Sequence, residues 1–371
     1  MIYLDNAAST PLSQSTKEYL MSLLDEYGNP SSLHCAGKKA HHLLSNARET
    51  VAGFINGDPE NIYFTPGGAA SNTLGIRGYY SKHNCHVFYS PIAHKSIQNC
   101  VHTLPRSTPL KINRSGQILL SELKKAMEKI SVPPFVVIDY ANSEIGTIQN
   151  VNEIIELVHA AGGMVYLDCT GSIPTIPVNV KSPDADMIGF SAHKLGGMKG
   201  CGVLYKKQEI TLEPLIYGSQ EQGLIGGTEN VLGIASLDAD IKQYDYSLVS
   251  SSSRDYVYRY IVRHIPKSRL VGSLKNRLAH NLYMCFKGVD GEALAFMLDL
   301  DGIAVSTGSA CNSHSLAASP VLLAIGMDEN DIHSCIRLTF SGNETRKELD
   351  YVCRRIQKNV ESLRSFPQDK K

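Results

Sequence analysis

The chain has 371 residues, enough for one large or two moderate domains, and its 36 Lys and Arg residues balance its 36 Asp and Glu residues. A neutral chain without a run of about 18 apolar residues suggests neither a nucleic-acid partner nor a membrane-spanning segment. Nine scattered cysteines without a C-x-x-C pair argue against a disulfide framework or a zinc ribbon, and MIYLDNAAST does not resemble a signal peptide, so we expect a cytoplasmic protein.

Short strand-like runs alternate with helix-like segments through the first half of the chain. Apolar residues recur with helical spacing in 41–55 and in 151–162, and the second segment stops at Gly162. This alternation predicts an α/β fold with a mostly parallel sheet that is covered on both faces. The runs rich in β-branched or aromatic residues are 61–65, 86–90, 135–140, 163–168, 186–191 and 201–206.

A Ser-rich stretch at 249–254 follows a helical segment and is typical of a join between domains. We expect a large domain over residues 12–248 and a smaller α+β domain formed by residues 1–11 and 249–371. The smaller domain would contain an apolar segment, a Gly- and Ser-rich turn and a closing amphipathic helix.

Polar or Gly-rich elements follow five consecutive predicted strands. Taken singly, each has a common structural explanation, since an Asp at a strand end more often caps a turn than catalyses a reaction. Ligands of open α/β sheets gather at the carboxyl ends of the strands, so together the elements predict one site. In chain order they are PGGAASN (66–72), His94, Asn142, Asp168 and the group Ser191, His193 and Lys194.

Lys194 lies among small residues in GFSAHKLGGMKG, although lysine normally belongs on a solvated surface. Small neighbours let a bulky group approach the backbone, and a lysine amine can form a Schiff base with an aldehyde. Asp168 could pair with a protonated pyridine nitrogen, and the start of a helix at PGGAASN could hold a phosphate. These features favour pyridoxal 5'-phosphate as the cofactor.

Cys311 lies in AVSTGSACNSHSLAAS (304–319), which is poor core material and good material for a mobile loop. An exposed thiol there would be a nucleophile, although the same composition suits a cysteine in a surface linker. We expect most of the other eight cysteines to be held by packing in strands and helices.

With these motifs considered together, the chain resembles the cysteine desulfurases, which are pyridoxal phosphate enzymes of fold type I. The most specific segments are FSAHKLGGMKGCGVLY and STGSAC, and the latter resembles the group with a long cysteine loop. The resemblance implies conversion of L-cysteine to L-alanine with a persulfide on Cys311, a homodimer, and a sulfur-acceptor protein, either a scaffold or a thiolation enzyme. Further matching segments are YLDNAAST, GNPSSLH, ANSEIGTIQ, GTEN and IRLTFS.

The resemblance also implies roles for single residues. Lys194 would hold the cofactor covalently, His94 would stack on its ring and help to transfer protons, and Asp168 would pair with the ring nitrogen. Asn142 would lie near the ring oxygen and the substrate, and Arg337 would bind the substrate carboxylate. The phosphate would be held by Ser191, His193, the backbone of Gly67, Gly68 and Ala69, and Thr228 from the other subunit.

Four positions depart from the family pattern. Ala69 and Gly171 stand where a phosphate-binding Thr and a Gln that contacts the ring oxygen are usual, and Gln222 and Ile225 stand where arginines are usual. We expect the lost hydrogen bonds to weaken cofactor binding, and Ala69→Thr with Gly171→Gln to strengthen it. Two alternatives remain open: a selenocysteine lyase or other pyridoxal phosphate β-lyase, and a catalytically reduced dimeric sulfur-transfer scaffold.

Overall fold

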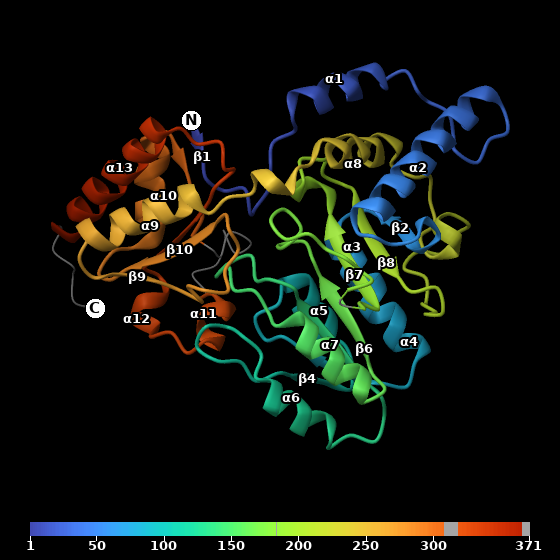
Figure 1. Ribbon diagram of the computed structural model, residues 1–371, viewed down its shortest axis with the longest axis horizontal. Helices are drawn as coiled ribbons and strands as arrows, with labels where there is room; N and C mark the ends of the chain where they lie inside the picture. Colours follow the sequence, from blue (N-terminus) through green and yellow to red (C-terminus); the bar gives the residue numbers. More distant parts are fainter. Residues whose placement is uncertain (183, 308–317, 366–371) are drawn as a thin grey trace.

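The computed structural model describes residues 1–182, 184–307 and 318–365 (Figure 1). Its larger part is built on a seven-stranded sheet with the strand order β2-β8-β7-β6-β5-β3-β4. β8 pairs antiparallel with β2 and β7, whereas the remaining pairs are parallel, so the predicted mostly parallel sheet is confirmed. The strands are β2 (Ile62–Thr65), β3 (His86–Tyr89), β4 (Ser107–Pro109), β5 (Pro134–Asp139), β6 (Met164–Asp168), β7 (Met187–Ser191) and β8 (Gly202–Lys206).

Every one of the six predicted strands is present, with ends within one residue of the prediction. The prediction missed β4, an edge strand of three residues that ends on a proline. Edge strands tolerate proline because one side of their ladder has no partner, and so short a segment has no recognisable alternation.

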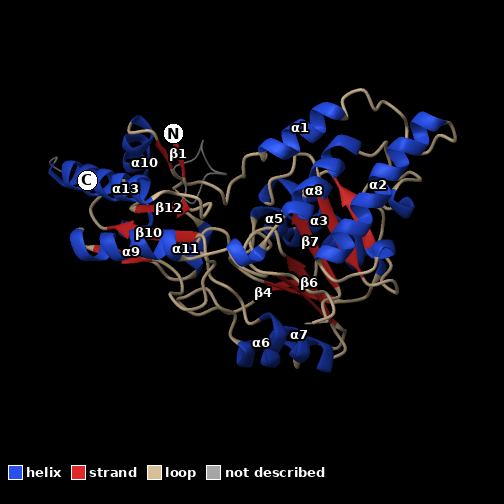
Figure 2. Cartoon of the chain, turned by 45° about the horizontal axis from the view of Figure 1, so that its top comes forward, coloured by secondary structure: helices blue, strands red, loops and turns tan. Residues whose placement is uncertain are grey.

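Helices cover both faces of this sheet (Figure 2). Alternate side chains of a strand point to opposite faces. In β5, Val136 and Ile138 therefore pack with α2, α7 and α8, whereas Phe135 and Val137 pack with the π-helical stretch, α4 and α5. The helices of this part are α1 (Gln14–Ser22), α2 (Cys35–Phe54), α3 (Gly68–Thr73), a π-helical stretch (Leu74–Gly78), α4 (Tyr79–Lys82), α5 (Lys95–His102), α6 (Leu120–Met127), α7 (Val151–Ala160) and α8 (Val231–Gln243). Short 3₁₀ turns lie at Pro59–Asn61, Ala192–Lys194, Glu221–Gly223 and Tyr246–Leu248.

The smaller part holds a three-stranded antiparallel sheet with the order β12-β10-β9, and the N-terminal β1 pairs with β11 beside it (Figure 1). Leu4 belongs to the apolar core of this part, so the first residues of the chain pack with its last third. The expected boundary between two domains stays a prediction. The elements are β1 (Ile2–Tyr3), α9 (Ser252–His264), β9 (Ser268–Leu270), β10 (Asn281–Phe286), α10 (Gly291–Leu300), β11 (Ile303–Ala304), α11 (Pro320–Ala324), α12 (Glu329–Ile332), β12 (Cys335–Thr339) and α13 (Arg346–Ser365).

A separate apolar cluster joins the two parts. Ile92 and Ile145, from turns that follow β3 and β5, pack against Val271, Tyr283 and Leu322 of the smaller part. The carboxyl end of the parallel sheet therefore faces the smaller part. No helix of the described ranges has both the length and the apolar character needed to cross a membrane.

Candidate active site

Asp168 ends β6 near the centre of the large sheet and is 4 % exposed. Its Oδ2 accepts a hydrogen bond from Asn72 Nδ2 at 2.8 Å, and its Oδ1 accepts one from the backbone N–H of Thr170 at 2.8 Å. Within the described part of the chain, this carboxylate has no cationic side chain as an ion-pair partner. A buried carboxylate held by neutral N–H donors keeps lone pairs for a cationic donor, which is what a pyridinium requires.

Asn72 of α3 links Asp168 to His94. The Asn72 Nδ2 also donates to Ser96 Oγ at 2.8 Å, and the Asn72 Oδ1 accepts a bond from the Tyr166 hydroxyl at 2.7 Å. Ser96 Oγ lies 2.8 Å from His94 Nδ1, and the Ser96 backbone N–H donates to the same nitrogen because His94 caps α5. The structure thus brings two predicted site residues into one cluster. The sequence analysis missed Ser96 and Tyr166, although Ser96 follows His94 by two positions.

A second set of donors lies where α3 begins. Gly67 has a φ of 153°, which a side chain would disfavour, and Gly68 donates its N–H to Ser191 Oγ at 3.3 Å. A Cβ placed on Gly68 would lie 3.1 Å from Thr170 Oγ1, so the Thr170 and Ser191 hydroxyls both lie beside this backbone. Hydroxyl groups next to the first N–H groups of a helix suit a phosphate. Ala69 is exposed on the same turn and adds no hydroxyl.

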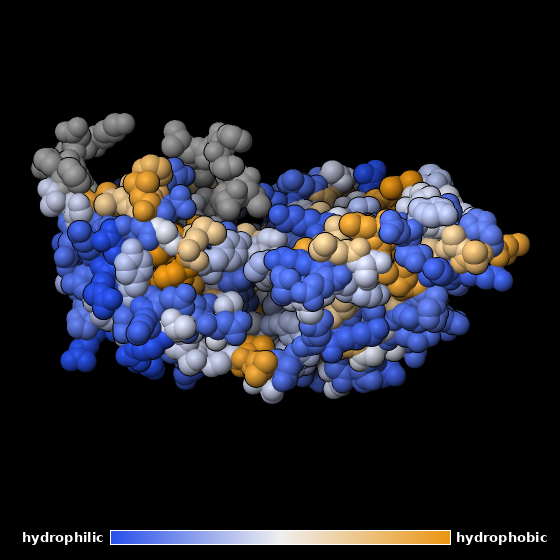
Figure 3. Space-filling model, turned by 90° about the horizontal axis from the view of Figure 1, so that it is seen from above, coloured by the Kyte–Doolittle hydropathy of each residue, from blue (hydrophilic) through white to orange (hydrophobic). Residues whose placement is uncertain are grey.

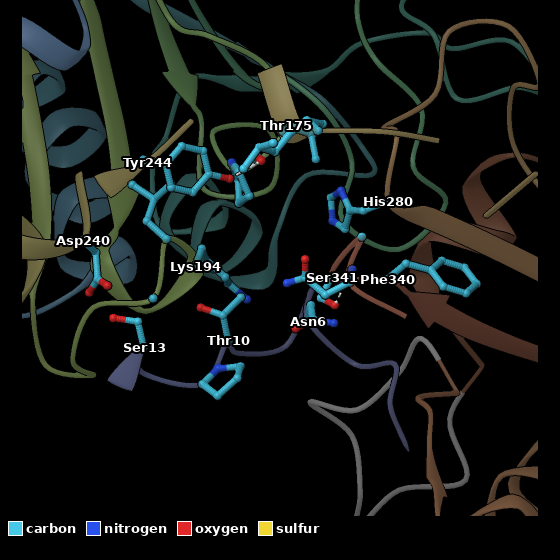
Figure 4. A pocket seen from close by; sticks show the side chains of 18 of the residues that line it. Asn6, Thr10, Ser13, Thr175, Lys194, Asp240, Tyr244, His280, Phe340 and Ser341 are labelled. Atoms are coloured by element: carbon cyan, nitrogen blue, oxygen red, sulfur yellow. Dashed lines mark hydrogen bonds between the residues drawn. The ribbon is translucent and has the colours of Figure 1, made fainter. Parts of the chain in front are cut away.

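Lys194 lies in the 3₁₀ turn that follows β7. Its Nζ donates to the carbonyl oxygen of Ala8 at 2.8 Å and also to that of Ala7. The side chain lines a cavity of about 520 Å³ whose walls come from both parts of the molecule. Figure 4 shows Lys194 in this cavity, with Asp240 towards one end and His280 towards the other. The amine is therefore at the carboxyl end of the sheet, where the sequence predicted it.

His193 and His280 are both neutral at pH 7. Burial, together with the positive charges of Lys194 and Lys199, lowers the pKa of His193 to about 4. Burial and the nearby Arg337 and Lys194 likewise lower the pKa of His280 to about 4. His193 can therefore offer a hydrogen bond to a phosphate. The sequence analysis did not single out His280, which lines the cavity but lies far from Lys194 in the chain.

Asn142 and Arg337 lie on adjoining segments. The Asn142 side chain holds the turn after β5: its Nδ2 donates to the Ile92 carbonyl at 2.6 Å, and its Oδ1 accepts backbone bonds from residues 144 and 145. Arg337 of β12 donates to the carbonyl oxygen of Ser143 at 3.2 Å and pairs with Asp5 at 2.9 Å. Its Nε is buried without a hydrogen-bond partner within the described ranges. A contact of Asn142 with a ring oxygen stays a prediction.

Gly171 lies where two turns approach each other closely. A Cβ at this position would lie 2.9 Å from the carbonyl oxygen of Ala141 and 3.3 Å from the Ser143 Cβ. A backbone carbonyl cannot move aside as a flexible side chain can, so the close approach of two turns requires glycine here. This close approach argues against the expectation that Ala69→Thr with Gly171→Gln would strengthen cofactor binding, which stays a prediction to be tested.

The other unusual positions lie away from this cluster. Gln222 donates to the Glu60 carbonyl at 3.0 Å and accepts a bond from the Tyr63 hydroxyl at 2.9 Å, whereas Ile225 is buried in the core. Thr228 is exposed and forms no hydrogen bond with the other predicted site residues in the ranges that the structure covers. Its expected role across a subunit boundary stays a prediction.

The predicted nucleophile, Cys311, lies outside the described residues. The eight described cysteines are free, and all of them except Cys35 are buried. Burial raises the pKa of Cys85 to about 11 and that of Cys201 to about 12, which makes both thiols poor nucleophiles. The expectation that packing would hold most of these cysteines is confirmed for the described chain, and the exception is Cys35, which is exposed at the first position of α2.

The comparisons with known proteins extend over nearly the whole chain. The family Aminotransferase class-V matches residues 2–352. The cysteine desulfurase IscS of Dictyoglomus turgidum is 35% identical over 379 residues, covering 98% of this chain and 96% of the relative. A solved NifS-like protein has a TM-score of 0.90 at 26% identity and covers 98% of this chain and 100% of that chain. The structure of SspA in complex with cysteine has a TM-score of 0.81 at 28% identity, with coverage of 93% and 100%. The predicted fold class is confirmed.

Proposed function

The chain belongs to the aminotransferase class-V family, and we propose that it is a pyridoxal phosphate-dependent cysteine desulfurase, which converts L-cysteine to L-alanine. The observation that carries this proposal is the buried Asp168 carboxylate, tied through Asn72 and Ser96 to His94. The extensive similarity to cysteine desulfurases supports this reaction, and the structural relative in complex with cysteine supports the substrate.

The donors at the carboxyl end of the sheet fit the cofactor. When bound, pyridoxal phosphate supplies a pyridinium ring that withdraws electrons from an attached amino acid. We assign covalent attachment to the Lys194 amine and the ring nitrogen to Asp168, whose remaining lone pairs suit a cationic N–H. The groups assigned to the phosphate are the Ser191 and Thr170 hydroxyls, neutral His193 and the backbone of Gly67, Gly68 and Ala69.

Arg337 and His94 are assigned to the substrate. Arg337 is 5 % exposed and has one N–H without a partner, so its guanidinium can bind the cysteine carboxylate while Asp5 and Ser143 hold it in place. His94 is exposed at the start of α5 and would stack on the ring and move protons. Asn142 would support both side chains, because it holds the turn that contacts Arg337 and bonds to the Ile92 carbonyl two positions before His94.

Cys311 is assigned as the sulfur acceptor. The substrate C–S bond breaks, its sulfur joins the Cys311 sulfur as a persulfide, and the substrate carbon gains a proton to give alanine. The described residues on either side of this segment support the assignment. The Tyr283 hydroxyl lies 3.3 Å from the Thr307 carbonyl, and the Ser319 hydroxyl donates to Glu144 at 2.6 Å, two residues from Asn142. Thr307 and Ser319, which flank this segment in the chain, therefore lie beside the site.

We also propose that the protein is a homodimer and that it works in the cytoplasm, which is a reducing compartment. Apolar side chains are visible on the surface at the end of the molecule that α1 and the loop after it form (Figure 3). α1 and this loop contain the exposed Met21, Leu24 and Leu33. Such a patch suits an interface between two copies, and the exposed Thr228 could then reach the cofactor phosphate bound by the partner subunit.

The free cysteines of the described chain fit the reducing conditions of the cytoplasm. A sulfur-acceptor protein would remove the persulfide.

Mass spectrometry tests this function directly. The cofactor-loaded protein is incubated with L-cysteine without reductant, alanine is measured, and the modified peptide is mapped. We expect alanine, one added sulfur on Cys311, and loss of both multiple turnover and the adduct in Cys311→Ser. Cys35→Ser is the matched control, because Cys35 is the exposed cysteine of the described chain, and it should behave as wild type. Absence of alanine, or an adduct that remains in Cys311→Ser, would contradict the proposal.

A further inference from the structure

We propose that Asn72 and Ser96 are positioning residues that hold Asp168 and His94 in one rigid arrangement and keep the proton of the neutral His94 ring on Nε2. The inference rests on the proposed function for the roles of Asp168 and His94. It adds the two side chains between them and names the His94 atom that exchanges protons.

The Asn72 amide has a single satisfactory orientation. Its Oδ1 accepts the Tyr166 hydroxyl at 2.7 Å, while its Nδ2 donates to Asp168 Oδ2 and to Ser96 Oγ, each at 2.8 Å. A flipped amide would turn Oδ1 towards the Asp168 carboxylate, where two acceptors would face each other without a proton. The orientation therefore follows from the hydrogen bonds alone.

Tyr166 keeps the amide from moving. The Tyr166 ring is fully buried, and a Cβ on either Gly75 or Gly189 would overlap it, so the backbone closes around the ring on two sides. Interiors packed this closely do not let an aromatic ring shift without a cost. The Tyr166 hydroxyl is therefore a fixed reference for Asn72, and Asn72 in turn fixes the Asp168 and Ser96 oxygens.

The bonds at Ser96 determine the His94 tautomer. The Ser96 backbone N–H donates to His94 Nδ1 at 3.2 Å, so this nitrogen is an acceptor. Ser96 Oγ accepts a hydrogen bond from Asn72 Nδ2 and donates its own hydroxyl proton to a hydrogen bond with His94 Nδ1 at 2.8 Å. A neutral imidazole has one acceptor nitrogen and one N–H, so the proton lies on Nε2. Any proton that His94 exchanges with the substrate moves at Nε2.

Loss of the Ser96 hydroxyl should weaken the preference of His94 for the Nε2–H tautomer without abolishing it. Ser96→Ala keeps the backbone N–H at 3.2 Å and removes the shorter contact at 2.8 Å. One such hydrogen bond corresponds to a change of about five- to tenfold in an equilibrium. We expect the tautomer ratio of His94 to shift by about that factor in Ser96→Ala. The fall in kcat should be smaller, because the Nε2–H tautomer stays populated, and KM should be nearly unchanged.

Nitrogen-15 NMR of histidine-labelled, cofactor-loaded full-length protein tests the tautomer at pH 8. The His94 signals are assigned with His94→Gln, and Ser96→Ala is compared with Ser96→Thr, which keeps a hydroxyl. Gln98→Ala is the matched control, because Gln98 loses a side-chain bond from the same helix, to the Ser90 carbonyl, outside the cluster. We expect an unprotonated Nδ1 in wild type, Ser96→Thr and Gln98→Ala, and a mixture of tautomers in Ser96→Ala.

A double-mutant cycle tests the coupling. Because Asn72 acts on His94 through Ser96, the effects of Asn72→Ala and Ser96→Ala on the tautomer ratio should fail to add. A protonated Nδ1 in wild type, a Ser96→Ala spectrum equal to that of Gln98→Ala, or additive effects in the cycle would each overturn the proposal. The wild-type spectrum, once assigned, needs no turnover, so failure of the proposed desulfurase activity would leave this result readable by itself.

Discussion

Glu144 is a buried acid that holds the described residues on both sides of the Cys311 segment. It is 8 % exposed, and its Oε1 accepts the Ser319 hydroxyl at 2.6 Å and lies 3.1 Å from the Tyr283 hydroxyl. Burial raises the pKa of Glu144 from 4.5 to about 7, against the opposing hydrogen bonds and the charge of Arg337. We expect Glu144→Gln to keep both contacts, because an amide oxygen accepts hydrogen bonds and carries no charge to desolvate.

The raised pKa fixes the sign of the pH dependence. Between the unfolded value of 4.5 and the folded value of about 7, the folded protein binds more protons at Glu144 than the unfolded chain does. The free energy of unfolding therefore falls as the pH rises through this range. Above the range Glu144 is ionised in both states, and the destabilisation caused by its buried charge is complete. The shift of 7 − 4.5 = 2.5 units limits the penalty to roughly 3 kcal/mol, and roughly 2 to 3 kcal/mol of it develops between about pH 5 and pH 8.

Urea unfolding at pH 5 and pH 8, at one protein and cofactor concentration, measures this pH-dependent loss of stability. The free energy of unfolding of Glu144→Gln minus that of wild type should rise by roughly 2 to 3 kcal/mol from pH 5 to pH 8. Asp139, whose pKa burial raises to about 6, is present in both proteins, so its effect cancels in the difference. A difference that is the same at both pH values would refute the reasoning.

Three further predictions concern the site. Lys194→Ala should leave no covalent cofactor after borohydride treatment, and a mass-spectrometric adduct of wild-type yield would contradict the assignment. Asp168→Asn should keep the circular dichroism spectrum and lose at least about a hundredfold in alanine production, because a neutral amide cannot stabilise a pyridinium; near-normal turnover would argue against the pairing. Gly171→Gln should weaken cofactor binding in an absorbance titration, because its Cβ would lie 2.9 Å from the Ala141 carbonyl oxygen. Gly53→Gln is the control and should not change the affinity, because the space around Gly53 is open. Tighter binding by Gly171→Gln would show that the turn can move aside.

The sequence by itself determined the elements of the large sheet and the places where they end. β-Branched and aromatic runs bounded by Gly, Pro, Asn and Asp are local signals, and they located β2, β3, β5, β6, β7 and β8 within one residue. The same local information placed Asp168, His94 and Lys194 at strand ends, and the parallel sheet then brings those ends to one edge. Resemblance to a family added the reaction and the assignment of Cys311.

Only the tertiary structure decided which of these groups touch and which space remains between them. Asn72 reaches Asp168 and Ser96 because the helices that follow β2 and β3 pack side by side on one face of the sheet, and no spacing in the chain records that contact. Gly171 must be glycine because the carbonyl of Ala141, thirty positions earlier, lies against it. The proton on Glu144 depends on burial by residues from both parts of the molecule. Periodicity and turn chemistry act between neighbours in the chain, whereas hydrogen bonds, close approach and desolvation act between neighbours in space.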